Sequence, residues 1–394
     1  MAVLWTVLNG AGPDGYNNRM TDFPDVLVIG GGVIGLTSAY FLAREGVRVE
    51  VVDQGEPGRE ASWAGAGILP PGNPARARTP FDQLRAHSSA LFPTLSADLR
   101  ERTGIDNGYL RCGGLEFAGD AGAAAHEEWR GEGIASEALD EPALRRLEPA
   151  LAAGLGTAYH LPDLAQVRNP RHVKALRAGC QALGVGLISG CPVHGFERQG
   201  SRITAARSAA GLRRAGRFVL AAGAWTEALL EPFGWRPGIH PVRGQIALLD
   251  PGRPVFRHVL LWGARYLVPR ADSRVLVGST EEAAGFEKRT TAAAVSDLLA
   301  LAGTLIPQLA QAHLEQCWAG LRPGSPDGMP FLGPVPGCDN LVIAAGHFRA
   351  GIQLSPGTAL VLKELLLDQP LTVSLEPFRL DRIPTPGHHV AFPS

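Results

Sequence analysis

The clearest pattern in the chain is an apolar run, a cluster of glycines and then a second apolar run. Residues 26–29 are all apolar, which predicts a buried strand. A helix is expected from Val33 to Glu45 and a second strand from Val47 to Val52. Gly46 stands where the glycine that ends a helix belongs. Together these segments predict a βαβ unit of about 30 residues.

Strands that end in glycine corners recur in the middle and near the end of the chain. The stretch RRAGRFVLAAGAW predicts one such strand, and the apolar run Leu341 to Ala345 predicts another. The second strand leads into the corner GHFRAGI and then into a helical segment. Segment 80–149 is predicted to be helical and variable, whereas alternating segments from Pro241 to about Cys317 predict antiparallel strands.

These elements predict an α/β fold of two interleaved domains. We expect a Rossmann-like domain with a βαβ unit of the glutathione-reductase type, interleaved with a substrate domain on a mostly antiparallel sheet plus helices. The ranges expected are 23–80, 150–238 and 323–394 for the dinucleotide domain, 81–149 and 239–322 for the substrate domain, and 1–22 for a loose N-terminal extension.

Length and composition support this organisation and exclude some classes of protein. The 394 residues are too many for one compact core, and 45% hydrophobic with 19% charged residues is typical of a well-packed globular chain. A net charge of −1 argues against a nucleic-acid or anionic-membrane surface. The five cysteines show neither a disulfide framework nor metal-ligand spacing, so we expect a reducing cytoplasm and no metal. No apolar run reaches the roughly 18 residues that a spanning helix needs.

Gly30, Gly32 and Gly35 form a G-x-G-x-x-G fingerprint directly after the first strand. The first glycine permits the tight turn, the second lets a pyrophosphate approach the backbone, and the third lets the helix pack closely on the sheet. The helix that follows would direct its N-terminus at the phosphates. Asp53, after the next strand, can accept hydrogen bonds from ribose hydroxyls and disfavours the 2′-phosphate of NADP.

The loop after the second strand distinguishes FAD from NAD. A nicotinamide-binding domain would normally continue into another βα unit, but the chain has the small-residue stretch GREASWAGAGILPP from Gly58 to Pro71. Its backbone N–H groups could approach a second phosphate and an isoalloxazine ring. An ordinary surface loop is the alternative, and Trp63 among the glycines argues against it. We therefore predict FAD.

Five stretches in this order resemble the FAD-dependent D-amino-acid oxidase superfamily, and in particular its glycine oxidase (ThiO-type) branch. They are VIGGGVIGLTSAYFLAREG, EASWAGAGIL, VLAAGAWT, WAGLRPGSPDGMPFLGP and AAGHFRAGIQLSPGTA, and they span residues 25 to about 365. ASWAGAG and GHFRAGI are the more specific pointers to the glycine oxidase branch.

The resemblance implies which residues hold FAD. The fingerprint and Asp53 would hold the AMP half, Val193 would contact the adenine through its backbone, and Ala222 and Gly223 would line the cofactor behind the sheet. The full set expected to bind FAD is Gly30, Gly32, Val33, Ile34, Gly35, Asp53, Ser62, Ala64, Gly65, Val193, Ala222, Gly223, His347, Arg349, Gly351 and Ile352.

The resemblance also implies a substrate pocket. Arg322 matches the arginine that clamps the substrate carboxylate, and Tyr266 matches the tyrosine whose hydroxyl assists it. Arg349 matches an arginine near the same pocket, which would act as a gate or second clamp or else form a structural ion pair. Cys317 and Cys338 do not stand where related sarcosine oxidases attach their flavin, so non-covalent FAD is expected.

The activity that the resemblance implies is oxidative deamination of glycine. A hydride would pass from Cα to flavin N5, giving an imine that yields glyoxylate and ammonia or feeds the thiazole of thiamine, while O2 becomes H2O2. Sarcosine and small D-amino acids stay open as substrates. An amine or D-amino-acid dehydrogenase that passes electrons to a quinone or carrier is one alternative, and a FAD-holding structural protein with an inactive pocket is another. No nucleic-acid or membrane partner is expected, and a homo-oligomer is left open.

Overall fold

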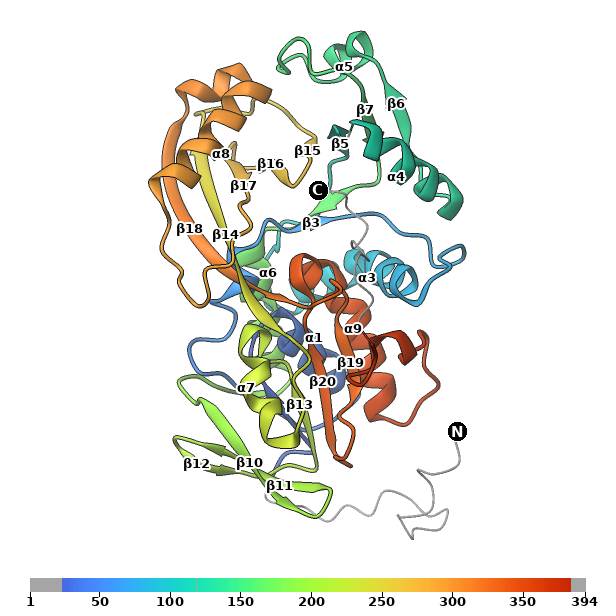
Figure 1. Ribbon diagram of the computed structural model, residues 1–394, viewed down its shortest axis with the longest axis vertical. Coiled ribbons are helices and arrows are strands. Elements are labelled where there is room, and N and C mark those ends of the chain that lie inside the picture. Colours follow the sequence, from blue (N-terminus) through green and yellow to red (C-terminus); the bar gives the residue numbers. More distant parts are fainter. Residues whose placement is uncertain (1–22, 118, 384–394) are drawn as a thin grey trace.

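The computed structural model of the protein describes residues 23–117 and 119–383. The predicted N-terminal extension, residues 1–22, lies outside the described residues. Figure 1 shows two sheets, one above the other, with helices packed around each.

The first sheet joins strands from the beginning, the middle and the end of the chain. Its six strands run in the order β19-β20-β13-β1-β2-β9. Five of them are parallel, and β19 is antiparallel to β20. The expected βαβ unit is present, with α1 between β1 and β2. The elements are β1 (Val26–Ile29), α1 (Val33–Arg44), β2 (Val49–Val52), β9 (Gly186–Ile188), β13 (Arg217–Leu220), β19 (Phe331–Pro334) and β20 (Leu341–Ala345).

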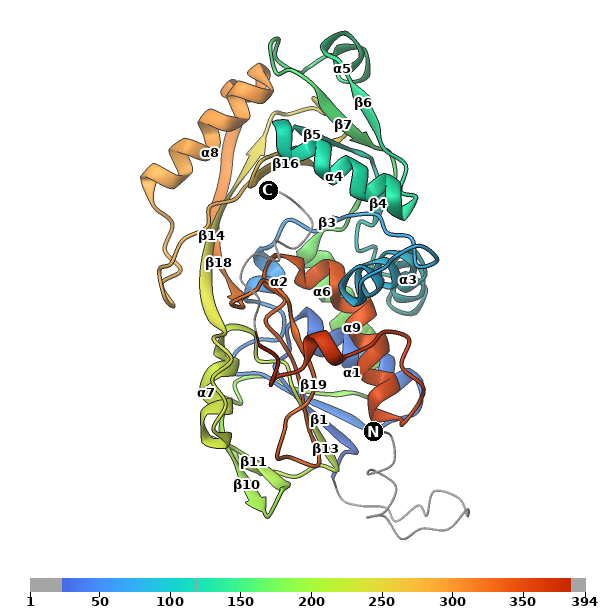
Figure 2. The same ribbon diagram turned by 45° about the vertical axis from the view of Figure 1, so that its right-hand side comes forward.

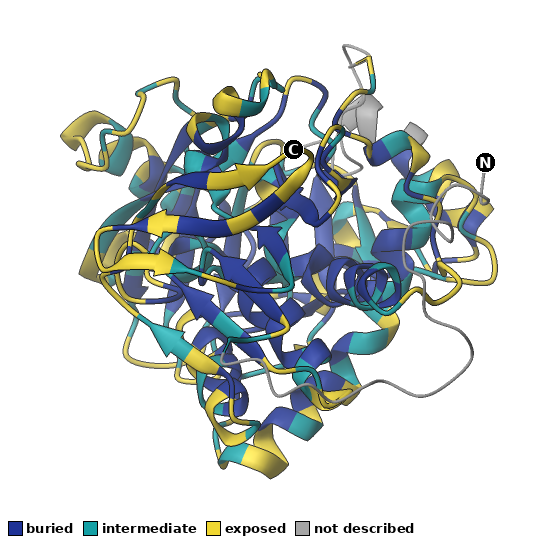
Figure 3. Ribbon diagram, turned by 90° about the horizontal axis from the view of Figure 1, so that it is seen from below, coloured by how far each residue is buried: buried dark blue, intermediate teal, exposed yellow. Residues whose placement is uncertain are grey.

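Strand β1 is buried on both faces, which explains its uninterrupted apolar sequence. Val26 and Val28 pack into a cluster with helices α1 and α9 (Gly351–Leu366). Leu27 and Ile29 pack into a second cluster on the opposite face of the sheet. In Figure 3 the buried residues gather on the central strands and helices, while exposed residues mark the periphery.

The end of α1 differs slightly from the prediction. The helix ends at Arg44 rather than at Glu45, and Gly46 follows it with φ of 82°, as expected of a glycine at this place. The Val47 N–H donates to Leu42 O at 3.2 Å. Val47 therefore belongs to the helix cap, and β2 begins at Val49 instead of Val47.

The second sheet has eight strands in the order β18-β14-β17-β16-β15-β5-β7-β6. Its neighbours are antiparallel except for β15 and β5, which are parallel. The prediction of antiparallel strands after Pro241 is thus confirmed. The strands are β5 (Gly114–Phe117), β6 (Glu137–Leu139), β7 (Ala158–Leu161), β14 (His240–Asp250), β15 (Val259–Trp262), β16 (Arg265–Pro269), β17 (Val275–Gly278) and β18 (His313–Gly324).

Two predictions for the second sheet were incomplete. Helix α8 (Ala292–Leu305) interrupts the antiparallel segment and packs on the outer face of β14 (Figure 2). Segment 80–149, predicted to be helical, begins with α3 (Pro80–Thr103) but also contributes β5 and β6 to this sheet. These short strands are paired by distant partners, β15 and β7, so their local sequence gives little sign of them.

The remaining strands form two small three-stranded sheets, in the orders β10-β11-β12 and β3-β8-β4. The small strands are β3 (Ile68–Leu69), β4 (Leu110–Arg111), β8 (Ala165–Gln166), β10 (Val193–Gln199), β11 (Arg202–Ser208) and β12 (Gly211–Arg213). The helices are α2 (Ala61–Ala64), α4 (Gly119–Glu132), α5 (Glu141–Leu147), α6 (Asn169–Ala182) and α7 (Thr226–Leu230). Within the part of the chain that the structure describes, no helix combines the length and apolar character required to cross a bilayer.

Helices α3 and α9 approach each other closely at Gly357. Its N–H donates to Ser88 Oγ at 2.8 Å. A Cβ added at Gly357 would lie 2.6 Å from Leu84 O and 2.6 Å from Ser88 Oγ. Neither α3 nor α9 could keep its place if this position carried a side chain.

We expect Gly357→Ala to lower the free energy of unfolding by about 1–3 kcal/mol, because the added methyl overpacks the α3–α9 contact. Urea denaturation followed by circular dichroism measures the change. Gly303→Ala is the matched control in α8, since its Cβ would make an ordinary contact 3.5 Å from Ala310 Cβ. That variant should be neutral or stabilised by up to about 1 kcal/mol, as for Gly to Ala in a helix. Equal stability of both variants would contradict the close approach.

Candidate active site

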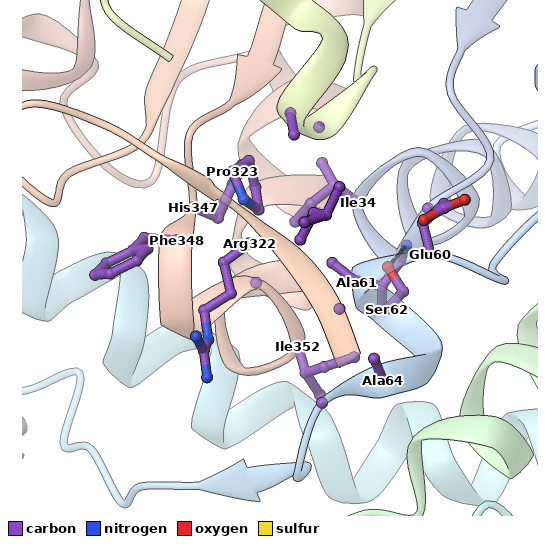
Figure 4. A pocket seen from close by; sticks show the side chains of 18 of the residues that line it. Ile34, Glu60, Ala61, Ser62, Ala64, Arg322, Pro323, His347, Phe348 and Ile352 are labelled. Carbon is purple, nitrogen blue, oxygen red and sulfur yellow. Dashed lines mark hydrogen bonds between the residues drawn. The ribbon is translucent and has the colours of Figure 1, made fainter. Parts of the chain in front are cut away.

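A long pocket runs from the carboxyl ends of β1 and β2 to the inner face of the second sheet. Gly30 and Asp53 line one end, and Tyr266 and Arg322 line the other. Figure 4 shows the Arg322 side chain projecting from its strand into this space, with Ser62 and Ala64 on the opposite wall. The pocket therefore joins the predicted dinucleotide site to the predicted substrate site.

The glycine fingerprint forms a turn that side chains could not occupy. Gly30 has φ of 108°, and a Cβ there would lie 2.3 Å from Ala221 O. A Cβ at Gly35 would lie 2.0 Å from Gly30 O, so this glycine allows α1 to pack against the strand end. At Gly32 an added Cβ would meet Ser62 Oγ at 3.3 Å, and Gly32 itself lines the pocket. These contacts agree with the three roles expected of the fingerprint.

Asp53 lines the pocket and also holds the glycine turn together. Its Oδ2 accepts a hydrogen bond from Gly31 N at 2.7 Å, and its Oδ1 accepts one from Gly55 N at 2.8 Å. Each carboxylate oxygen can accept a second hydrogen bond. Asp53 could therefore keep these bonds and also accept from ribose hydroxyls, as predicted.

Ser62 fixes the small-residue loop to the beginning of α1. Its Oγ accepts a hydrogen bond from Val33 N at 2.8 Å, so it satisfies one of the first N–H groups of a helix that has no side-chain cap of its own. Ala64 and Gly65 follow it along the pocket wall.

Three residues far away in the chain hold the same loop, and the sequence analysis missed them. Asn169 Nδ2 donates to Ser62 O at 3.0 Å, Trp318 Nε1 donates to Ala64 O at 2.9 Å, and Arg270 Nη2 donates to Ala66 O at 2.6 Å. Trp318 opens the stretch WAGLRPGSPDGMPFLGP, but nothing in that stretch indicates a bond to the loop, and Asn169 and Arg270 lie outside the five stretches.

The corner between β20 and α9 forms the floor of the pocket. His347 is buried, and its Nε2 lies 3.1 Å from Thr358 Oγ1 in α9. Burial lowers the pKa of His347 to about 3, so the ring is neutral at physiological pH. Phe348 has φ of 47°, an uncommon value for a residue with a side chain. Gly351 and Ile352 then begin α9 and line the pocket.

Arg322 and Tyr266 lie over glycines of the neighbouring strands. A Cβ at Gly244 would come within 2.4 Å of Arg322 Nη1, and one at Gly278 would come within 2.6 Å of the Tyr266 hydroxyl. Arg322 donates from Nη1 to Thr280 O at 3.1 Å and from Nη2 to Ser279 Oγ. Burial lowers the pKa of Arg322, and the adjacent Tyr266 opposes that change. The guanidinium is therefore half-buried, held in one orientation and directed into the pocket.

Arg349 has a different environment at the rim of the pocket. It pairs with Glu281, and its guanidinium lies 5.5 Å from the ring of Phe348. Arg349 was predicted to be either a gate or second clamp, or a member of an ion pair. The structure shows an ion pair. Whether Arg349 also contacts a substrate remains a prediction.

The loop between β17 and α8 is attached to the pocket rim at two further points. Lys288 Nζ lies 2.9 Å from Glu60 Oε1, and the rings of Phe286 and Trp225 are 5.3 Å apart. Glu60 and Trp225 both line the pocket. Together with the pair of Glu281 and Arg349, these contacts hold residues 281–288 across one side of the opening.

Every predicted site residue except Gly35 lines this one pocket. Gly35 packs behind the turn, as its structural role requires. Val193 lies near the Asp53 end with Cys191, whereas Cys317 and Cys338 are not among the lining residues. Other lining residues that the sequence analysis did not identify include Leu261, Gly244 and Gln353.

Comparisons with known proteins agree with this arrangement. A family model described as FAD dependent oxidoreductase matches residues 25–365. The chain is 40% identical over 346 residues to the glycine oxidase of Pseudomonas putida, a match that covers 86% of this chain and 94% of that protein. It is 35% identical over 370 residues to the bifunctional protein ThiO/ThiG of Synechocystis sp., covering 92% of this chain and 54% of that protein. The crystal structure of glycine oxidase from Geobacillus kaustophilus is similar with a TM-score of 0.86 and 32% identity, covering 91% of this chain and 99% of that one.

We expect Gly32→Val to abolish dinucleotide binding while the protein stays folded, because the side chain would occupy the place where a pyrophosphate approaches the turn. The ratio of released nucleotide to purified protein measures the effect. Gly186→Val is the matched control, since it lies in β9 and its Cβ would meet Glu50 Cγ at an ordinary 3.5 Å. A Gly32→Val protein that keeps a full complement of nucleotide would contradict the assignment of the turn.

Proposed function

This chain belongs to the FAD dependent oxidoreductase family, and from that premise we propose that it oxidises glycine at the amine-bearing carbon with O2 as the electron acceptor. The predicted family, the predicted FAD cofactor and the prediction that the chain is an oxidoreductase are confirmed by the family match. The choice of glycine is supported by the likeness to glycine oxidases and by the pocket itself.

The residues present suit FAD. The turn at Gly30 and Gly32 has no side chain in the place that a pyrophosphate would take, and the stretch 61–67 provides a wall of small residues with its backbone fixed from outside. We propose that the cofactor is held by the lining residues named above, with its adenosine end near Asp53 and Val193 and its isoalloxazine ring near the β20–α9 corner. When bound, FAD supplies the acceptor for the hydride that leaves the substrate Cα and is reoxidised by O2.

The observation that carries the proposal is the fixed, half-buried guanidinium of Arg322 beside Tyr266. Its acceptors within the described chain, Thr280 O and Ser279 Oγ, are neutral, so its positive charge is suited to a bound carboxylate. Because the side chain is already held in one orientation, little conformational entropy is lost when the substrate binds. Tyr266 adds a hydroxyl beside the same carboxylate and so fixes the direction of the Cα–H bond.

The rest of the pocket suits a small, neutral amine. Ile246 and Leu261 form an apolar wall next to Tyr266, which excludes water from the reacting carbon. His347 is neutral and engaged with Thr358, so we assign it no role as a general base. We propose that the substrate binds with its amine already deprotonated, its proton having passed to solvent, and that the residues position Cα without taking a proton from it.

Two finer aspects of the function extend this proposal. The product imine would hydrolyse to glyoxylate and ammonia, or supply the thiazole part of thiamine, which the likeness to the ThiO/ThiG protein supports. Sarcosine and small D-amino acids are further candidate substrates, because an arginine clamp recognises the carboxylate that they share with glycine.

Anaerobic addition of glycine, sarcosine and D-alanine to the FAD-loaded enzyme tests the function directly. Bleaching of the flavin absorbance by glycine, followed by H2O2 release when air is admitted, is the expected result. Bleaching without reoxidation by O2 would indicate a dehydrogenase that uses another acceptor. No bleaching by any amino acid or amine would indicate a protein that holds FAD without turning over a substrate.

We expect Arg322→Ala to bind FAD normally but to lose about 100- to 1,000-fold in kcat/KM for glycine, since losing a buried partner of a charged group costs about 3–4 kcal/mol. Steady-state H2O2 production and the flavin content of the purified protein measure both effects. Arg274→Ala is the control, because Arg274 pairs with Glu315 on the exposed side of the same sheet. Unchanged glycine turnover in Arg322→Ala would show that another group binds the carboxylate.

We expect Glu281→Gln to lower the KM for glycine by up to about fivefold at low ionic strength, because it removes the negative charge of a half-exposed ion pair with Arg349 worth about 1 kcal/mol or less. The difference should shrink at high salt, where such charges are screened. Glu287→Gln is the control, since Glu287 pairs with Arg289 in the same loop. If Glu281→Gln and Arg349→Ala both leave the KM unchanged, the pair is structural and Arg349 is not a second clamp.

A further inference from the structure

Gln353 is a buried polar side chain on the pocket wall and is not one of the proposed substrate contacts. It is the third residue of α9, it is 6% exposed, and it lines the pocket. Its Nε2 has no hydrogen-bond partner among the described residues. A buried amide without a partner is costly, and an apolar side chain of similar size would avoid that cost. A glutamine at this position therefore indicates a hydrogen-bond acceptor that is not part of the described chain.

Several other polar side chains around the pocket have partners. Ser62 accepts from Val33 N, Arg322 donates to Thr280 O, and His347 is within hydrogen-bond distance of Thr358. Elsewhere in the described chain Glu116 and His172 also have unpartnered buried atoms, but these residues do not line the pocket. Gln353 combines burial, a free donor and a place on the pocket wall.

The two acidic residues among those that line the pocket could not serve as the acceptor. Asp53 is bonded to Gly31 N and Gly55 N at the opposite end, and Glu60 is paired with Lys288 at the rim. The first turn of α9 contains no acidic residue, and Ala350 at its N-cap makes no side-chain hydrogen bond. With these carboxylates engaged elsewhere, the free donor of Gln353 points to an acceptor on a bound molecule.

The start of α9 favours an acceptor that carries negative charge. This helix has sixteen residues, so its N-terminus has a well-developed positive end. An amide donor in the same turn adds to that field. An isoalloxazine ring has such an acceptor in its C2 carbonyl, next to N1, where negative charge builds when the ring is reduced.

We propose that Gln353 is a cofactor-binding residue whose Nε2 donates a hydrogen bond to the C2 carbonyl of the isoalloxazine ring and stabilises the reduced form of FAD more than the oxidised form. The inference rests on the FAD cofactor of the family and not on the choice of substrate. It can therefore be tested without any amino acid present, and its failure would leave the assignment of glycine untouched.

Gln353→Met tests the proposal, since methionine has a similar length and no N–H donor. Compared with the unaltered protein, this variant should bind oxidised FAD several-fold more weakly. Its loss of affinity for reduced FAD should be about tenfold larger than its loss for oxidised FAD. That tenfold difference corresponds to a midpoint potential about 30 mV more negative for a two-electron couple. Gln353→Glu, which places a negative charge at the same position, should shift the potential further in the same direction.

Ser355→Ala is the matched control in α9. Ser355 is fully buried, donates within the helix to Ile352 O at 2.9 Å, and does not line the pocket. This variant should keep the potential and the FAD affinity of the unaltered protein. A shift equal to that of Gln353→Met would mean that any disturbance of α9 changes the flavin, which would overturn the proposal.

A second measurement changes the cofactor instead of the protein. The unaltered apoprotein is reconstituted with 2-thio-FAD, whose sulfur is a poor acceptor, and its affinity is compared with that for FAD. We expect the unaltered protein to bind 2-thio-FAD more weakly than FAD. Gln353→Met should bind the two cofactors equally well, because the N–H donor is already absent in that variant. An equal loss in both proteins would overturn the proposal. A changed KM for glycine with an unchanged potential would also overturn it, and would assign the amide to the substrate carboxylate.

Discussion

The pocket depends on how closely backbone can approach backbone at the turn after β1. Neither Gly30 nor Gly35 has room for a Cβ, which would lie 2.3 Å from Ala221 O in one case and 2.0 Å from Gly30 O in the other. Because no side chains intervene, the N-terminus of α1 reaches the carboxyl edge of the parallel sheet. Ser62 can then accept from Val33 N, and the small-residue loop is brought against the helix. A turn with larger residues would move α1 outward and separate the two walls of the cofactor site.

The substrate end is built by the same means on a different sheet. Gly244 and Gly278 leave room for the guanidinium of Arg322 and the ring of Tyr266, which lie across them. The two sheets are then joined through backbone acceptors of the loop 61–67, to which Trp318 and Arg270 donate. The cofactor wall and the substrate wall thus depend on each other, although most of their residues are far apart in the chain.

The sequence predicted the parts of this site that are local. A strand, three glycines, a helix and an acid form a contiguous pattern with a mechanical reason at each position, and the structure has that unit with shifts of one or two residues at its ends. It could not predict Asn169, Trp318 or Arg270, because their bonds to the loop depend on tertiary contacts alone. The strands β5 and β6 escaped prediction for the same reason, since their pairing partners are supplied by distant segments.

The three-dimensional environment also distinguishes two arginines that look equivalent in the sequence. Both stand near glycines at the end of a strand, and both line the pocket. Arg349 has an anion beside it in Glu281, on a loop at the rim, so much of its charge is already balanced. Arg322 is half-buried and bonded to neutral oxygens of Thr280 and Ser279. Burial of a cation is unfavourable unless an anion accompanies it. The fold therefore keeps at Arg322 a positive charge whose bonded acceptors are neutral, and this difference is the reason for proposing Arg322 rather than Arg349 as the carboxylate clamp.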